Sequence, residues 1–264
     1  MADWIDLLDP TEEELQTRLP KLDQPTREQL LAPPDPDGRT RPTLRGQGDH
    51  FFGVLLSPVL DPDRDRLYYQ EIDVIVTRSR VVTVRKTPPG EDPFDPSDVK
   101  GAVASHEDPH LGMIVYHLVD EIAERFLDLF DGIDDELDEL EQNVDVWDSQ
   151  RVRQRITDLR QDLLHSRRTL APTRDAVRGV VDGRVVADSS LLRREVFPEE
   201  VERAFARVLD KLLRASESIE FSRDLLAAVR DYQATQSAYE QNETIRRLTA
   251  VASLVLLPTL IVGV

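Results

Sequence analysis

Residues 242–264 read NETIRRLTAVASLVLLPTLIVGV and join a charged segment to an apolar one. The last seventeen residues, from Leu248 onward, carry no charge and directly follow Arg246 and Arg247. About 17 apolar residues is the lower limit for a helix that crosses a bilayer. The stretch therefore predicts the start of a first membrane helix, in the plasma or inner membrane. Because basic residues stay on the cytoplasmic side, residues 1–247 are expected to be cytoplasmic.

The segment before this stretch predicts one very long helix. Between Pro198 and Pro258 the chain contains neither proline nor glycine, and Glu199 and Glu200 favour the positive end of a helix dipole. About sixty residues at 1.5 Å each span roughly 90 Å. One small domain cannot bury such a helix, so it needs partners, either a hairpin of its own chain or copies of itself.

One face of this helix is small and polar. Its positions step by three or four and read Asp, Thr, Ala, Asn, Ile, Thr, Ala, Leu and Thr, at residues 231, 235, 238, 242, 245, 249, 252, 256 and 259. Such a face suits close helix packing or the lining of a pore. Any long helix offers some mixed stripe, so the pattern leaves a functional and an incidental interpretation open.

The composition limits the possible partners. A formal net charge of −18 with 32% charged residues argues against nucleic-acid binding, because phosphate groups would be repelled. The same charge suits a protein that attracts cations, and ordinary acidic solubility would look alike. The chain has no cysteine, which excludes disulfides and cysteine–zinc sites, and its first residues do not read as a signal peptide.

Residues 1–108 predict a mixed α/β domain. Thr11 and Glu14 have the spacing of a capping box, and a second short helix is expected at residues 25–32. Residues 33–49 and 87–97 are rich in loop-forming residues and predict irregular structure. Apolar and alternating segments predict three strands, a hairpin turn and a further helix, at Phe51–Val59, Tyr68–Thr77, Val81–Lys86, residues 78–80 and residues 97–105.

From about residue 109 the apolar period becomes helical. Apolar residues from Leu118 to Trp147 step by three or four, and thirteen acidic residues stand against one basic residue from Asp120 to Asp148. The following segment, residues 151–178, holds eight arginines and three aspartates. An antiparallel hairpin would set an acidic helix beside a basic one and pair their charges, with Pro172 bending or interrupting the second helix.

These observations predict an α+β fold in four parts: an α/β domain at 1–108, a helical hairpin at 109–195, a stalk helix at 196–247 and a truncated first transmembrane helix at 248–264. No phosphate loop, nucleophile elbow or HExxH motif is present, so no catalytic residue is expected and an enzyme is not favoured. His106 and His110 have metal-like spacing. Without a third anchored ligand, a structural role is the better interpretation of the two histidines.

Several stretches together resemble the CorA family of divalent-cation transporters. They are the opening at residues 4–15, the strands at 71–76 and 80–84, the acidic helix at 120–141, its return at 163–174, and residues 242–249 running into 257–263. The last of these resembles the base of the family's pore helix and its entry into the membrane. The resemblance covers nearly the whole chain.

The resemblance implies a homopentameric channel, mainly for Mg²⁺, with five copies of the long helix around a central path. Co²⁺, Ni²⁺ and Zn²⁺ remain open as transported ions, and the lipid bilayer is the second expected partner. The family has two membrane helices and a Gly-Met-Asn signature at the end of the first. This chain is expected to stop one or two residues before that signature, and therefore not to conduct ions by itself.

The resemblance also implies roles for individual residues. Asn242, Ile245, Leu248 and Thr259 fall where the family lines its pore. Asp231 falls near the cytoplasmic mouth, where a ring of five carboxylates could hold a hydrated Mg²⁺; a solvated stalk aspartate is the alternative. Gln29 and Arg207 fall where family members carry a regulatory pair of carboxylates. Neither side chain ligates a hard cation well, so that sensor is expected to be absent or relocated.

A second class of function stays open. The chain could be a helical scaffold tethered to a membrane, or a truncated relic of the family, that transports nothing. The reading frame after Val264 discriminates the two classes, because a Gly-Met-Asn-like turn and a second apolar span favour the channel, whereas a stop codon favours the relic.

Overall fold

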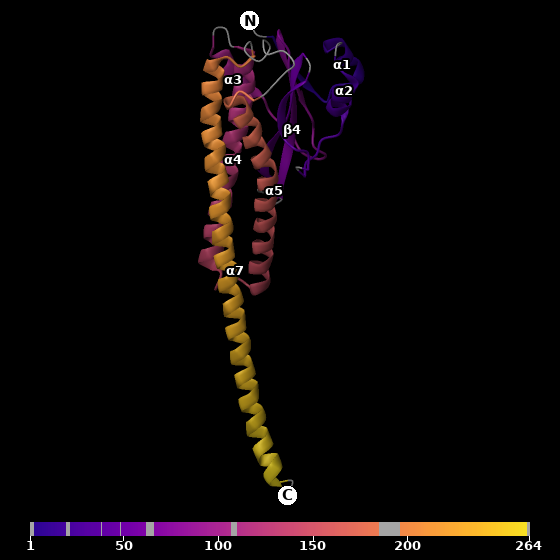
Figure 1. The fold of residues 1–264 in the computed structure, drawn as a ribbon. Coiled ribbons are helices and arrows are strands. Elements are labelled where there is room, and N and C mark those ends of the chain that lie inside the picture. The colour runs from indigo at the N-terminus through magenta and orange to yellow at the C-terminus, as the bar shows by residue number, and fades with distance from the viewer. Residues whose placement is uncertain are drawn as a thin grey trace.

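The computed structural model describes residues 3–19, 22–37, 39–47, 49–61, 66–106, 110–184 and 196–262, with the side chains of Glu240 and of residues 254–262 outside the description. The elements are β1 (Asp3–Leu8), α1 (Glu12–Arg18), α2 (Gln24–Leu31), β2 (Thr43–Gln47), β3 (His50–Asp61), β4 (Arg66–Val76), β5 (Arg80–Arg85), α3 (Ser97–Ala104), α4 (Leu111–Asn143), α5 (Ser149–Val181) and α7 (Glu199–Val262). The predicted α+β fold is confirmed (Figure 1).

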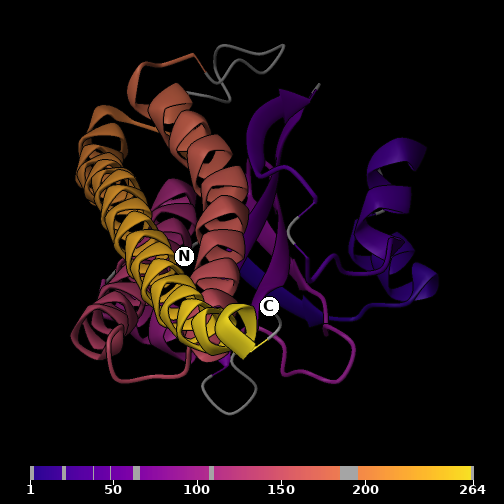
Figure 2. The same cartoon turned by 90° about the horizontal axis from the view of Figure 1, so that it is seen from below.

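The five strands form one sheet in the order β1-β5-β4-β3-β2. β1 runs parallel to β5, and all other neighbours are antiparallel. Ile72, Val74 and Val76 of β4 face the helical core, as their alternation predicted, while Ile75 faces α1 and α2 on the opposite side. The sheet therefore lies between two unequal helical layers (Figure 2).

Two strands correct the sequence-based assignment. Residues 33–49 were expected to be loop throughout, but Thr43–Gln47 forms β2 and pairs with the start of β3. β1 was not predicted as a strand, and it pairs with β5 from a distance of about eighty residues, Asp3 opposite Arg80. Both strands lie at the edges of the sheet, where one neighbour supplies the hydrogen bonds and the apolar pattern is weak.

The local signals for helix ends are confirmed. Thr11 caps α1, since its hydroxyl accepts from the Glu14 N–H while the Glu14 carboxylate accepts from the Thr11 N–H. Pro198 supplies the carbonyl that starts α7. By contrast, Pro172 does not interrupt the second hairpin helix, because α5 continues through it to Val181.

The helical half of the molecule is a bundle rather than a hairpin alone. α4 and α5 both contact the sheet, and the first half of α7 packs against both of them far more than they pack against each other. The charge pairing expected between α4 and α5 occurs at Arg155 and Glu136, 2.6 Å apart. Other acidic residues of α4 pair with α7 instead. Lys211 of α7 lies 2.5 Å from Asp120 and 2.6 Å from Glu124.

A charged cluster is buried in the sheet. The ammonium group of Lys86, 3% exposed, lies 2.7 Å from Glu71 Oε1 and 2.9 Å from Asp73 Oδ2, and also donates to the Gln29 carbonyl at 2.9 Å. Neither oxygen of Asp73 has an oriented hydrogen bond within the described part of the chain. Burial raises the pKa of Asp73 to about 7, and the nearby Lys86 opposes this rise only in part.

Candidate functional site

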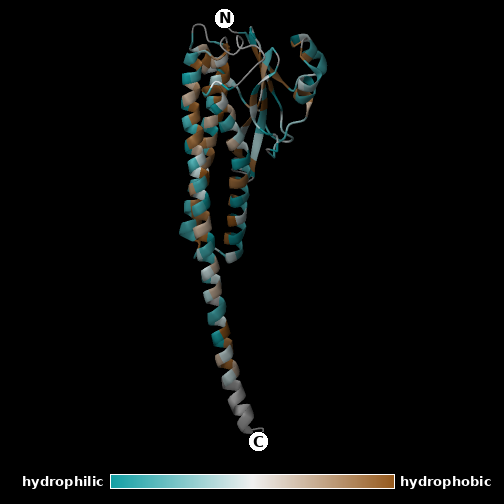
Figure 3. Cartoon of the chain, in the orientation of Figure 1, coloured by the Kyte–Doolittle hydropathy of each residue, from teal (hydrophilic) through white to brown (hydrophobic). Residues whose placement is uncertain are grey.

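The candidate site is the half of α7 that projects from the bundle. Up to Val229, apolar side chains of α7 are buried against α4 and α5 at regular helical spacing, among them Val201, Phe205, Val208, Leu212, Ala215, Ile219 and Leu226. Beyond Val229, every described side chain of α7 is exposed or half-buried. At its base Tyr232 and Gln236 hydrogen-bond Asp145, just beyond the end of α4, and the rest of the projecting half extends alone away from the other elements (Figures 1 and 3).

This projection is long and partly apolar. The 33 residues from 230 to 262 span about 50 Å at 1.5 Å per residue. Tyr239, Ile245, Leu248 and Val251 each expose more than 60% of their surface, against 0% for the bundle residue Leu212. An isolated helix with such a surface gains no tertiary packing, so the arrangement is that of a helix awaiting partners along its length.

The structure places the predicted pore-lining residues on this projection. Asn242 and Ile245 lie within about 40° of the direction of Asp231 around the helix axis, and Leu248 lies about 60° farther round than Ile245. All four side chains are exposed. The backbone of Thr259 continues the helix, while its side chain lies outside the described residues.

Hydroxyl groups on the same projection bond to their own helix. Thr235 donates to the Asp231 carbonyl at 2.9 Å, Thr249 to the Ile245 carbonyl at 2.8 Å, and Ser253 to the Thr249 carbonyl at 2.8 Å. Because these donors are already satisfied, the face can enter a poorly hydrated environment without leaving a hydroxyl proton unpaired. Their oxygen atoms keep a lone pair toward the outside of the helix.

Asp231 is the one carboxylate among the residues predicted for the pore. Its side chain is 73% exposed and accepts from the guanidinium of the adjacent Arg230 at 3.0 Å. No group of three or more potential metal ligands occurs in the ranges that the structure describes. A single chain therefore offers Asp231 as a lone ligand, and a metal site there requires the same residue from further copies.

The residues predicted to replace the regulatory carboxylates have other contacts. Arg207 donates to the Tyr116 hydroxyl at 3.4 Å, and one turn later Lys211 holds Asp120 and Glu124. Burial lowers the pKa of Lys211, but the hydrogen bonds to Asp120 and Glu124 outweigh it and the pKa is raised. Arg207 and Lys211 therefore place two positive charges on this part of α7. This agrees with the expectation that the family's regulatory cation site is absent here.

The histidines are arranged differently from the sequence spacing. His106 lies beside His117, with ring centroids 5.3 Å apart, whereas His110 precedes the first turn of α4 as its N-terminal cap. Burial, followed by the charge of His106, lowers the pKa of His117. Since His117 lies on α4, eleven residues beyond His106, which follows the end of α3, spacing along the chain gave no signal for this pair.

Within the part of the chain that the structure describes, no helix has enough length and apolar character to cross a membrane. Most of the apolar segment predicted to enter the bilayer, from residue 254 onward, lies outside the described side chains.

Comparison with known proteins agrees with this geometry. A sequence model of the CorA-like Mg²⁺ transporter proteins matches residues 2–264. The chain belongs to the CorA family. Structures of CorA relatives share the fold: the complete CorA magnesium transporter from Methanocaldococcus jannaschii superposes with a TM-score of 0.76 over 98% of this chain and 78% of that chain, at 18% identity.

Further proteins are similar to this chain in fold or in sequence. The ZntB cytoplasmic domain from Vibrio parahaemolyticus gives a TM-score of 0.67 at 15% identity and covers 90% of this chain and 89% of that domain. A putative metal ion transporter, YfjQ of Bacillus subtilis, is 26% identical over 82% of this chain. The cobalt/magnesium transport protein CorA of Thermotoga maritima is 25% identical over 85% of it. The aligned regions span 65% and 61% of the lengths of these two relatives.

Proposed function

We propose that this chain is the cytoplasmic part of a CorA-like transporter for divalent cations, with Mg²⁺ as the main ion and Co²⁺, Ni²⁺ and Zn²⁺ as further candidates. In this proposal residues 1–247 lie in the cytoplasm, and residues 248–264 begin the first helix in the plasma or inner membrane. Family membership supports the class of cargo, and the pair Arg246 and Arg247 before the apolar segment supports the orientation.

The observation that carries the proposal is the unpartnered half of α7. Five copies placed around an axis would give the exposed projection partners along its length, and would turn the small polar face with Asn242 and Ile245 toward a central path. The satisfied hydroxyls of Thr235 and Thr249 suit a path for an ion that keeps its water shell, because they offer oxygen atoms without demanding a bond. The complete assembly is thus a homopentameric channel.

Asp231 would form a ring of carboxylates at the cytoplasmic mouth of this path. Mg²⁺ gives up its waters reluctantly, so five carboxylates around a hydrated ion suit it better than direct ligation by one side chain. Arg230 pairs with Asp231 from the adjacent position on the helix. It therefore lowers the net negative charge of the ring without filling the centre, where the ion would lie. The ring concentrates divalent cations before they enter the pore.

Regulation by divalent ions would use residues other than the family's carboxylate pair. The guanidinium of Arg207 repels a cation, and Lys211 neutralises the nearest carboxylates of α4. We place any regulatory cation elsewhere on the cytoplasmic part.

The test is Mg²⁺ uptake by the full open reading frame that contains these residues, expressed in cells lacking their own Mg²⁺ transporters. Uptake is expected, and Asp231→Asn should reduce its rate at low Mg²⁺ at least about threefold, because the ring no longer attracts the ion. Asp175→Asn is the matched control, since it removes the same charge from an exposed position on α5. It should leave uptake unchanged.

Absence of uptake for all four divalent ions, from a correctly assembled protein, would overturn the transport proposal and favour the membrane-tethered scaffold. Equal loss in the Asp231 and Asp175 variants would reject only the carboxylate ring, because general surface charge would then explain the effect.

A further inference from the structure

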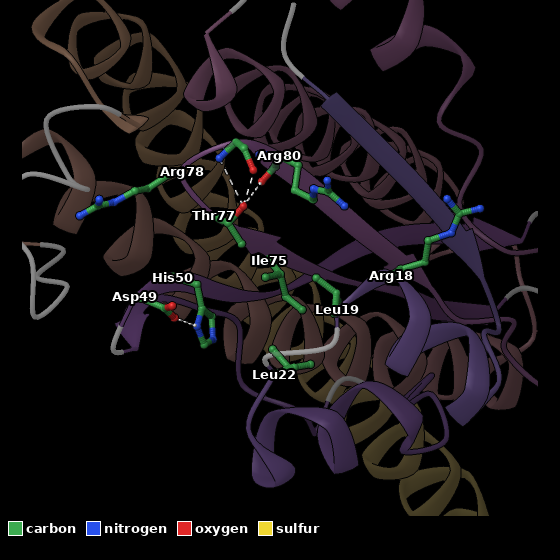
Figure 4. A pocket seen from close by; sticks show the side chains of 10 residues that line it. Arg18, Leu19, Leu22, Asp49, His50, Ile75, Thr77, Arg78 and Arg80 are labelled. Atoms are coloured by element: carbon green, nitrogen blue, oxygen red, sulfur yellow. Dashed lines mark hydrogen bonds and ion pairs between the residues drawn. The ribbon is translucent and has the colours of Figure 1, made fainter.

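A cavity of about 690 Å³ lies on the face of the sheet opposite the helical bundle. It is bordered by the end of α1, the turn between β4 and β5, and the start of β3 (Figure 4). The volume is in the range of pockets that enclose small organic ligands. The pocket is remote from α7, so neither the fold nor the proposed transport path accounts for it.

The floor of this pocket is apolar. Leu19 is 6% exposed, Leu22 9% and Ile75 1%, and all three belong to the core between the sheet and the two short helices. In Figure 4 their side chains gather at the centre of the cavity. A ligand seated there needs a compact apolar part to cover these side chains.

The rim of the pocket is basic in a chain of net charge −18. Arg18, at the end of α1, has no hydrogen-bond or ion-pair partner in the described part of the chain, and Arg80 forms an ion pair with Asp3 at 3.5 Å. Arg78 extends away from the pocket (Figure 4). Two guanidinium groups at the rim suit a doubly charged phosphate group, because each can donate two hydrogen bonds to a pair of phosphate oxygens.

His50 supplies a polar group without a partner. Its Nδ1 lies 3.2 Å from Asp49 Oδ1, and its Nε2 is buried and has no hydrogen-bond partner within the described ranges. The residue is only 7% exposed and lines the pocket. Because an ionised Asp49 can only accept a hydrogen bond, we assign the proton of the neutral ring to Nδ1; Nε2 is then an acceptor, and a buried acceptor is costly unless a donor such as a hydroxyl reaches it.

We propose that this pocket binds a hydroxyl-bearing organic phosphate of nucleotide size. The apolar part of the ligand covers Leu19, Leu22 and Ile75, its phosphate pairs with Arg18 and Arg80, and a hydroxyl donates to His50 Nε2. The α/β part of the protein would thereby take an anionic ligand at a site separate from any cation. This inference does not depend on the transport proposal.

The test is calorimetric titration of the 264-residue chain with AMP in the presence of EDTA, which removes any bridging metal. Saturable binding with one AMP per chain is expected, with inorganic phosphate and octanoate both weaker, since each lacks one of the two required parts. Arg18→Ala should weaken AMP binding roughly tenfold through the lost charged hydrogen bonds. Ser79→Trp, in the turn that borders the pocket, should abolish it by filling the mouth.

Arg203→Ala is the matched control, because Arg203 is exposed on α7 and lies outside the pocket. It should bind AMP as the parent does. In the parent, the ring signals of His50 in NMR spectra should shift on adding AMP, which requires no variant to fold. The proposal is overturned by absence of AMP binding at millimolar concentration, by tighter binding of octanoate than of AMP, or by binding that leaves the His50 signals unmoved.

Discussion

Inside the sheet, one cation, Lys86, lies against two carboxyl groups, those of Glu71 and Asp73. With Glu71 and Asp73 both ionised, the cluster carries one net negative charge that no described neighbour balances; with Asp73 protonated, it is neutral. Burying an uncompensated charge is expensive, which is why burial raises the pKa of Asp73 to about 7. The protonation state of one residue therefore affects the stability of the whole sheet.

The sign of the resulting pH dependence is definite. The folded-state pKa of Asp73 lies above its unfolded value of 3.8, so its stabilising effect is complete below pH 4 and is lost as the pH rises through 7. We expect the free energy of unfolding to fall by on the order of 2–3 kcal/mol between pH 5 and pH 8 from this residue. Urea denaturation of the parent and of Asp73→Asn across this range measures it.

In the Asp73→Asn variant this part of the slope should vanish, because the amide stays neutral at every pH. Every other residue is common to the two proteins, so the difference between the two curves isolates Asp73. Parallel curves for the two proteins would contradict the assignment.

At the scale of elements, two glycines of α4 differ in whether their surroundings leave room for a side chain. A Cβ on Gly112 would lie 2.0 Å from the Val196 carbonyl oxygen, whereas a Cβ on Gly132 would meet Leu60 Cδ2 at 3.7 Å, an ordinary contact. Gly112 thus allows the chain before α7 to cross close against α4. Gly132 has no such role, and it costs α4 about 1 kcal/mol relative to alanine.

The two alanine variants should therefore change stability in opposite directions. Gly112→Ala should lower the free energy of unfolding by more than about 2 kcal/mol, since backbone must move to relieve the clash. Gly132→Ala should raise it by roughly 0.5–1 kcal/mol through helix propensity. Thermal unfolding followed by circular dichroism tests both, and destabilisation of similar size in both variants would show that the close crossing is not the determining feature.

Sequence reasoning succeeded where a local pattern determines the structure. The capping box at Thr11, the alternation of Ile72, Val74 and Val76, and the helical stripe beginning at Leu118 each depend on neighbours within a few residues. β1 and β2 escaped prediction because edge strands are held by partners that the local pattern does not name. For the same reason, the acidic face of α4 gave no indication that Lys211 would neutralise it.

The candidate site was predictable to a similar depth. The spacing of residues 231, 242 and 245 placed them near one face of a long helix, and the structure leaves their side chains exposed. The transition at Val229, where α7 leaves the bundle, could not be located from sequence, because apolar residues continue on both sides of it. Neither could the unpartnered Nε2 of His50, which depends on distant elements meeting at one pocket.

At the scale of the whole molecule, the unpartnered half of α7 predicts assembly that responds to Mg²⁺. In detergent, sedimentation of the 264-residue chain should show a larger species with Mg²⁺ than with EDTA, since Mg²⁺ relieves repulsion among the Asp231 carboxylates. Ile245→Glu should shift the chain toward the monomer, because it adds a second ring of like charges. Val146→Glu, also at an exposed apolar residue but near the hairpin tip, should sediment as the parent does.

Neither substitution should change the thermal stability of the bundle, since both side chains lie on the surface of the single chain. A monomer in every condition would contradict assembly through this part of α7.

The continuity of α7 also has a mechanical consequence. One helix packs into the bundle as far as Val229, is tied by Tyr232 and Gln236 to Asp145 just beyond α4, and reaches about 50 Å past Val229. A rotation of the bundle by 5° would move the far end of such a rod by about 4 Å, provided it does not bend. No glycine or proline interrupts it between Glu199 and Leu257. The helix is therefore a lever, and small rearrangements among α4, α5 and α7 are amplified at its tip.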